Sequence, residues 1–139
     1  MTLVTRPDYL NVFLGRIGAF IIENKLGDGT GAGERAVIAS QNWVTGLSAR
    51  NPWQTKLIAA SLRNPSQLEL LAGTDVYTMP PKVAAGGRKE LKGEFSSQLH
   101  QNYEVNLFSS AAEARIEKFW EVDDNVINLA ERLAASLPA

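Results

Sequence analysis

The sequence predicts an α/β fold in which three parallel strands alternate with helices and a helical tail follows. Three short apolar segments rich in strand-forming residues, 9–13, 56–60 and 75–79, are separated by segments in which apolar residues recur at helical spacing. Strands alternating with helices are typical of a parallel sheet with crossover connections. The length of 139 residues suits one domain with a single core.

The first strand is followed by two predicted helices. Residues 9–13 (Y-L-N-V-F) are apolar enough for a buried strand. Apolar residues then recur at helical spacing from Ile17 onward, and Gly27 is expected to end this first helix. After a glycine-rich loop that we expect to be flexible, a second helix is predicted over residues 34–47, and Asn51-Pro52 breaks it.

The second and third strands each lead into a helix that opens with proline. Asn64-Pro65 combines an N-cap with proline at the first helical position, which predicts a helix over residues 65–72. Pro80-Pro81 opens the helix after the third strand, and Gly86-Gly87 is expected to weaken or end it.

We expect residues 1–139 to form a single, partial domain. Its β/α units occupy residues 8–93 on this prediction, and residues 93–107 are irregular. Residues 110–137 carry apolar positions at helical spacing, which predicts C-terminal helices.

Composition excludes several classes of function. The chain has no cysteine and one histidine, His100, so we expect neither a metal site nor a cofactor bound through these residues. The net charge of −1 gives no basic surface for nucleic acid. No apolar run approaches the roughly 20 residues of a membrane span, and the N-terminus lacks a signal-peptide core, which favours a cytoplasmic protein without a membrane partner. The glycine run 27–33 lacks Gly-Lys-Ser/Thr and follows a helix, so it does not indicate a nucleotide site.

Basic and hydroxyl side chains follow the first two strands. Arg16 comes shortly after the first strand, and Ser61 and Arg63 follow the second. Carboxyl ends of neighbouring parallel strands share one edge of a sheet, so both arginines are expected there on adjacent loops. Two guanidinium groups with a hydroxyl and the helix start at Asn64 suit a phosphate. For either arginine alone we would favour a solvated loop residue or an ion pair along a helix; the combination with Ser61 and the helix start favours an anion site.

These residues belong to recognisable motifs. A-A-S-L-R-N at 59–64, L-A-G-T-D at 71–75 and T-M-P-P at 78–81 resemble the seventh and eighth strands of transaldolases. N-V-F-L-G-R-I at 11–17 resembles the sixth-strand motif of the same family. The bacterial fructose-6-phosphate aldolases of that superfamily share the pattern. The resemblance covers about residues 8 to 85, with three motifs in the expected order.

The resemblance implies that the chain is the C-terminal portion of a transaldolase-like (β/α)8 barrel, from the sixth to the eighth strand. By position, Arg16, Ser61 and Arg63 match the residues that hold the phosphate of the sugar substrate, and Asn11 falls where many transaldolases have a serine lining the active site. Such enzymes work in carbohydrate metabolism of the pentose phosphate type and need no cofactor. A lysine forms a Schiff base with a ketose phosphate, and a dihydroxyacetone unit is transferred or released.

The strands that carry this lysine in the family have no counterpart here on our prediction, since a whole barrel needs on the order of 200 residues or more. Lys56 begins its strand, at the wrong edge, and Lys82 falls in a helical turn. A non-catalytic phosphosugar-binding module or an assembly half-barrel is therefore the alternative function. We also expect a homo-oligomer, or association with the missing barrel half, that buries residues such as Val12, Ile58 and Val76.

Overall fold

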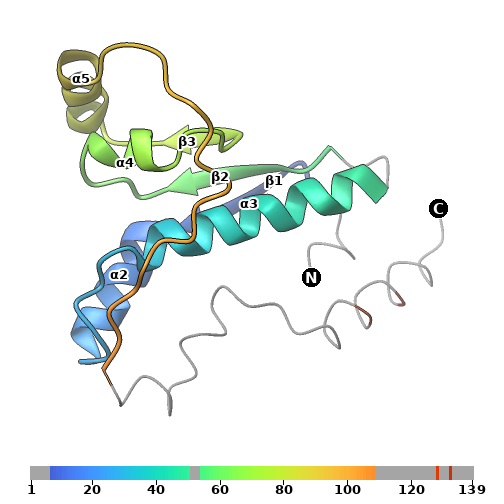
Figure 1. Cartoon of the computed structure of the whole chain (residues 1–139), viewed down its shortest axis with the longest axis horizontal. Coiled ribbons are helices and arrows are strands. Elements are labelled where there is room, and N and C mark those ends of the chain that lie inside the picture. The colour runs from blue at the N-terminus through green and yellow to red at the C-terminus, as the bar shows by residue number, and fades with distance from the viewer. Residues whose placement is uncertain (1–6, 51–53, 109–127, 129–131, 133–139) are drawn as a thin grey trace.

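The computed structural model describes residues 7–50, 54–108, 128 and 132. Within these residues the chain forms a three-stranded sheet and its connecting helices (Figure 1). The elements, in order, are β1 (Tyr9–Phe13), α2 (Leu14–Glu23), α3 (Ala32–Arg50), β2 (Lys56–Ala60), α4 (Ser66–Leu70), β3 (Val76–Thr78) and α5 (Pro81–Glu90). Apart from residues 128 and 132, the predicted tail helices over 110–137 lie outside the described part of the chain.

The sheet is parallel with the strand order β1-β2-β3, which confirms the predicted class of fold. β3 is shorter than the predicted strand 75–79. Asp75 lies outside it and makes hydrogen bonds to Gln41 and Leu57. The Asp75 carboxylate accepts hydrogen bonds from the Leu57 N–H and from the amide of Gln41, both at 2.9 Å, and the Asp75 N–H donates to Gln41 Oε1 at 3.2 Å. Asp75 therefore ties α3 to the amino-terminal edge of β2.

Helix α2 begins directly after β1 and ends earlier than predicted. Lys25, not Gly27, adopts the left-handed conformation that ends the helix, with φ of 55°. The Lys25 N–H donates to the Ile22 carbonyl at 3.0 Å and the Leu26 N–H to the Ile21 carbonyl at 2.9 Å, which is the Schellman arrangement. Leu26 and Ile21 also share a buried cluster, the apolar contact that accompanies this motif.

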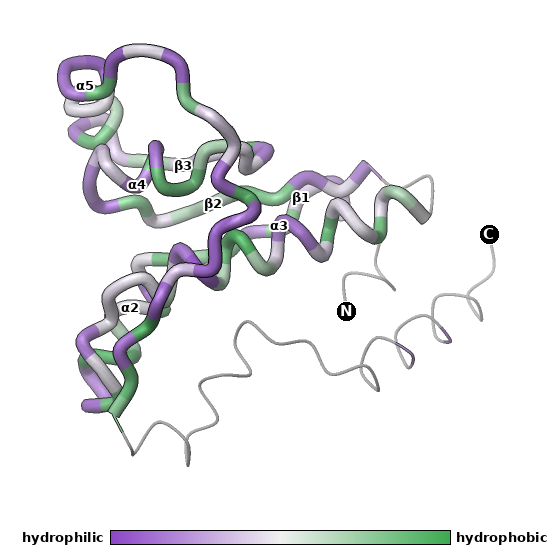
Figure 2. The backbone as a smooth tube through the Cα atoms, in the orientation of Figure 1, coloured by the Kyte–Doolittle hydropathy of each residue, from purple (hydrophilic) through white to green (hydrophobic). Residues whose placement is uncertain are grey.

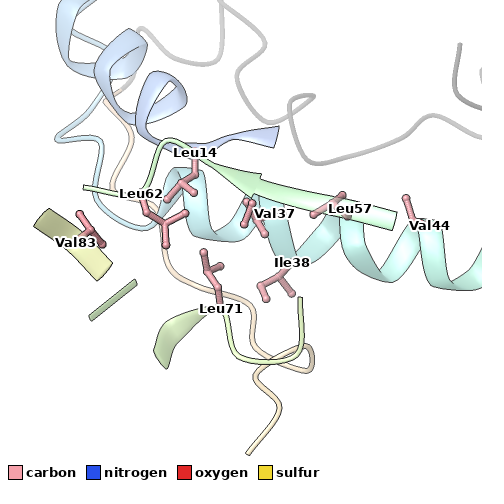
Figure 3. Packing of buried hydrophobic residues seen from close by; sticks show 9 residues of the cluster. Leu14, Val37, Ile38, Val44, Leu57, Leu62, Leu71 and Val83 are labelled. Carbon is pink, nitrogen blue, oxygen red and sulfur yellow. The ribbon is translucent and has the colours of Figure 1, made fainter. Parts of the chain in front are cut away.

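Helix α3 lies along one face of the sheet (Figure 1) and extends beyond the predicted 34–47 at both ends. Figure 2 shows hydrophobic stretches alternating with hydrophilic ones along it, as a half-buried helix requires. Its apolar side carries Val37, Ile38 and Val44, which pack with residues of the sheet and of α4 and α5 into the main core (Figure 3). The core residues exposed by 2% or less include Leu14, Leu57, Leu62 and Leu71.

Helix α5 continues through Gly86-Gly87, so the expectation that these glycines end it is wrong. A Cβ atom on Gly86 would lie 2.6 Å from Cγ of Pro65, and one on Gly87 would lie 3.0 Å from Cδ1 of Leu68. The two glycines therefore allow α5 to pack closely against α4. The packing offsets the destabilising effect that glycine has inside a helix.

The two faces of the sheet differ in what covers them. Leu10, Val12 and Tyr77 pack against the core under the helices, so the expectation that Val12 would be buried at an interface is wrong. Strand alternation places Tyr9, Asn11, Phe13, Ile58 and Val76 on the opposite face. Tyr9 and Phe13 there are 54% and 50% exposed, so the described residues leave this face open.

The segment 103–108 returns across α3 to the end of α2 (Figure 1). Val105 and Leu107 pack on the cluster of Ile21, Leu26 and Ala32. An isolated antiparallel bridge joins Leu107 to Gly27, where a side chain would collide with the Asn106 carbonyl. Residues 93–107 otherwise form no helix or strand, as predicted. Among the described helices, none combines the length and the hydropathy that crossing a membrane requires.

The contact between α4 and α5 predicts opposite effects for two substitutions of helical glycines. Gly86→Ala should lower the free energy of unfolding by about 1–3 kcal/mol, because the new methyl group overpacks against Pro65. Gly46→Ala in α3 is the matched control: nothing lies within 4 Å of a Cβ there, so it should raise stability by about 0.5–1 kcal/mol. Urea denaturation followed by circular dichroism measures both; a stabilised Gly86→Ala protein would contradict the packing argument.

Candidate functional site

The carboxyl ends of β1 and β2 meet at one edge of the sheet, where Phe13 pairs with Ala60. The start of α2 therefore lies against the loop that follows β2. A Cβ atom on Gly15 would lie 2.5 Å from the Ser61 carbonyl oxygen and 2.7 Å from Arg63 Nε. Arg63 Nη2 donates a hydrogen bond to the Gly15 carbonyl at 3.3 Å. Gly15 thus allows the Arg63 side chain to lie directly over the start of α2.

Arg16 and Arg63 line the same surface pocket, which we call the arginine pocket. It has a volume of about 440 Å³ and is lined by Arg16, Ala19, Phe20, Glu23 and Arg63. Arg16 lies in the first turn of α2 and not on a loop as expected, because the helix follows β1 without a connection. Both arginines are exposed, and two guanidinium groups on one pocket can bind a doubly charged anion through paired hydrogen bonds.

Ser61 connects β2 to the Arg63 loop in a strained conformation. Its φ of +68° lies in the left-handed region, which costs a non-glycine residue about 1–2 kcal/mol. Its Oγ would be 2.9 Å from a Cβ on Gly15, so the hydroxyl lies beside the start of α2. Backbone strain of this kind persists where the surrounding structure holds it, and it is frequent at ligand-binding sites.

The start of α4 offers fewer free N–H groups than we expected for an anion. Asn64 Oδ1 accepts from the Gln67 N–H at 3.2 Å, and Gln67 Oε1 accepts from the N–H groups of Arg63 at 2.7 Å and Asn64 at 3.4 Å. This reciprocal pattern is a capping box, although Pro65, already in helical conformation, flanks the assigned helix. Since Pro65 has no N–H and α4 spans only five residues, the arginines carry the attraction for an anion.

Asn11 lies on the open face of the sheet, opposite Ile58 in register, and it is exposed. It does not line the arginine pocket, whose residues come from α2 and from the loop after β2. Asn11 therefore lies on the face of the sheet opposite the helix-covered core. In a barrel, this is the face that points toward the interior, where further strands would enclose a site.

A larger cavity of about 580 Å³ lies between α2, the first turn of α3 and α4, and Arg63 lines it too. The Tyr103 hydroxyl, which donates to the Leu70 carbonyl, helps to enclose it. Burial raises the pKa of Tyr103, and the nearby Glu34 carboxylate adds to the effect. Hydrogen bonds from the Thr30 N–H and from the side chain of Asn106 lower the pKa of Asp28 at the cavity rim.

Two polar residues that were not predicted as site residues, Gln67 and Glu34, lie behind residues 61–65, the loop that carries Arg63 and that we call the arginine loop. Gln67 is only 8% exposed, and its Nε2 donates to Glu34 Oε1 at 2.6 Å. The Asn-x-x-Gln spacing from Asn64 to Gln67 is the signal that could have identified the capping box. The contact with Glu34 spans 33 positions in sequence and has no local signal.

A parallel α/β sheet with its helices packed on one face and polar residues at the carboxyl edge is the architecture of a sector of an α/β barrel. The chain belongs to the transaldolase/fructose-6-phosphate aldolase family, whose model matches residues 3–134. The resemblance predicted from the motifs is therefore confirmed, and membership supports a sugar-phosphate aldolase type of function. A search of curated proteins finds no match.

The conformation of Ser61 predicts that its replacement by glycine stabilises the fold but weakens phosphate binding. Ser61→Gly should raise the free energy of unfolding by about 0.5–1 kcal/mol, because glycine adopts a positive φ without strain. The same variant loses the hydroxyl donor and should bind inorganic phosphate more weakly. Thermal denaturation and calorimetric titration measure the two effects, and a loss of stability would show that the Ser61 hydroxyl outweighs the strain.

Proposed function

We propose that this chain provides the phosphate-binding wall of a transaldolase-type active site for sugar phosphates. Arg16, Ser61 and Arg63 hold the phosphate, and Asn11 lines the site on the open face of the sheet. The observation that carries the proposal is that Arg16 and Arg63, 47 positions apart, line one pocket. Family membership supports the same type of substrate.

The phosphate serves as a handle that positions the reacting carbonyl group of the sugar. Binding energy from such a remote group can hold the carbonyl next to a nucleophile and so lower the barrier to reaction. In the mechanism that the family resemblance implies, a lysine forms a Schiff base with the ketose phosphate. The resulting iminium accepts the electron pair when the carbon–carbon bond breaks, and a dihydroxyacetone unit stays on the lysine.

The lysines of the described residues are all exposed, so we propose that this role belongs to other strands of the barrel; they are Lys25, Lys56, Lys82, Lys89 and Lys92. Lys56 begins β2, at the amino-terminal edge of the sheet and away from the arginines. Lys82 lies in the first turn of α5 and is exposed to solvent. A lysine needs burial or a neighbouring cation to become a nucleophile near neutral pH, which an exposed position does not supply.

Removal of either arginine should weaken phosphate binding. We expect Arg16→Ala and Arg63→Ala each to raise the dissociation constant of inorganic phosphate about tenfold or more, because each variant removes charge-assisted hydrogen bonds. The matched control is Arg88→Ala, which removes the same charge from the exposed last turn of α5. Isothermal titration calorimetry at constant ionic strength measures all three; equal losses in all variants would indicate general electrostatic attraction and contradict the site.

Borohydride reduction in the presence of fructose 6-phosphate tests where the nucleophile lies. We expect the mass of this chain alone to stay unchanged, because none of its described lysines is placed to form the Schiff base. A covalent adduct on Lys82 would overturn this part of the proposal and identify Lys82 as the nucleophile. Phosphate binding without an adduct, even when the remaining strands are supplied, would favour the alternative of a non-catalytic phosphosugar-binding module.

A further inference from the structure

The hydrogen bonds of Gln67 connect the arginine loop to a second helix. Gln67 Oε1 accepts from the Arg63 N–H at 2.7 Å, and Gln67 Nε2 donates to Glu34 Oε1, in the first turn of α3, at 2.6 Å. The Gln67 side chain is 8% exposed, so water competes little for these bonds. One buried amide thus bridges the backbone of the loop and the carboxylate of Glu34.

We propose that Gln67 is a positioning residue that, together with Glu34, sets the backbone of Arg63 for phosphate binding. The proposal rests on the proposed function, in which Arg63 holds the phosphate. It assigns the affinity of that site in part to two residues that do not line the arginine pocket.

The geometry goes beyond what a helix cap requires. In a capping box the residue at the third helical position accepts from the N–H of the N-cap residue. Here that bond, to the Asn64 N–H, is the longer one at 3.4 Å, and the shorter one goes to Arg63. The strongest contact of the Gln67 oxygen is therefore with the residue that carries the guanidinium group.

Glu34 determines which way the Gln67 amide faces. A carboxylate only accepts hydrogen bonds, so it requires the NH₂ group of the amide and turns the oxygen toward the Arg63 N–H. The opposite orientation would place two donors together at Arg63 and two acceptors together at Glu34. The hydrogen bond to the carboxylate is also charge-assisted and is therefore stronger than a hydrogen bond between two neutral groups.

The other bonds of the loop act beside the Arg63 backbone and not on it: the Arg63 guanidinium donates to the Gly15 carbonyl, and Asn64 Oδ1 accepts from the Gln67 N–H. Between the strained Ser61 and α4 the chain has only Leu62, Arg63, Asn64 and Pro65, and the Leu62 side chain is 1% exposed in the core. Leu62 fixes one side of Arg63 and Gln67 fixes the other. Without the Gln67 bond, the Arg63 backbone gains freedom that phosphate binding must then remove.

Three variants test the proposal. Gln67→Met keeps a similar shape without hydrogen bonds. Gln67→Glu keeps the acceptor for Arg63 but places a carboxylate against that of Glu34. The double variant Gln67→Glu/Glu34→Gln reverses the pair, so that the amide at position 34 donates to the carboxylate at position 67. Asn64→Ala is the control, because it removes the cap of α4 while leaving the Gln67 side chain in place.

We expect Gln67→Met to speed amide hydrogen exchange of Arg63 and to raise the dissociation constant of inorganic phosphate, each by about tenfold, the size expected for one lost hydrogen bond. Gln67→Glu should show similar losses, and the double variant should recover both. Asn64→Ala should lower the thermal stability without weakening phosphate binding. Hydrogen exchange followed by NMR and calorimetric titration provide the readouts.

The readouts separate this proposal from the proposed function. A wild-type chain that binds no phosphate would overturn the proposed function, while the exchange rates would still show whether Gln67 holds the loop. Unchanged exchange in Gln67→Met, or unchanged phosphate affinity in a chain whose Arg63 amide exchanges faster, would overturn the positioning role. A double variant that stays as impaired as Gln67→Glu would overturn the part assigned to Glu34.

Discussion

The parallel pairing of β1 with β2 is the interaction on which the rest of the structure depends. Its register sets Phe13 beside Ala60, so the chain that leaves each strand meets the other at the same edge. Gly15 lets the two segments touch, because a side chain there would collide with Ser61 and Arg63. A shift of register by one residue would turn the apolar face of β1 away from the core and separate the arginines as well.

Close approach of backbones recurs in this fold and explains why its glycines matter more than helix propensity suggests. Gly86 and Gly87 weaken α5 as an isolated helix but allow it to pack against Pro65 and Leu68 of the neighbouring unit. Dense packing of this kind makes short elements such as α4 and β3 tenable, since neither has enough internal hydrogen bonds to be stable alone.

Two groups of polar side chains among the described residues lie at opposite edges of the sheet. At the amino-terminal edge Asp75 and Gln41 join β3, β2 and α3 in a closed set of hydrogen bonds with a structural role. At the carboxyl edge the charged Arg63 side chain is exposed to solvent, while the strained Ser61 and the buried Gln67 lie beside it. In β/α barrels, residues at one edge of the sheet usually contribute to stability and residues at the carboxyl edge bind ligands. The arrangement here agrees with membership of the transaldolase/fructose-6-phosphate aldolase family.

The sequence by itself determined the parallel α/β class, the family, and the two segments that carry Arg16, Ser61 and Arg63, because strand patterns and short motifs depend on neighbouring residues. It failed where packing outweighs local preference. Helix α2 stops at Glu23, before Gly27, because Leu26 packs on Ile21 in a cluster that Val105 and Leu107 cover. Helix α5 continues through its glycines because it packs against Pro65 and Leu68. Only the tertiary structure decided that Arg16 and Arg63 line one pocket and that Gln67 bridges Arg63 to Glu34. Arg16 and Arg63, and likewise Glu34 and Gln67, are far apart in the chain, so no local sequence pattern predicts that they lie together.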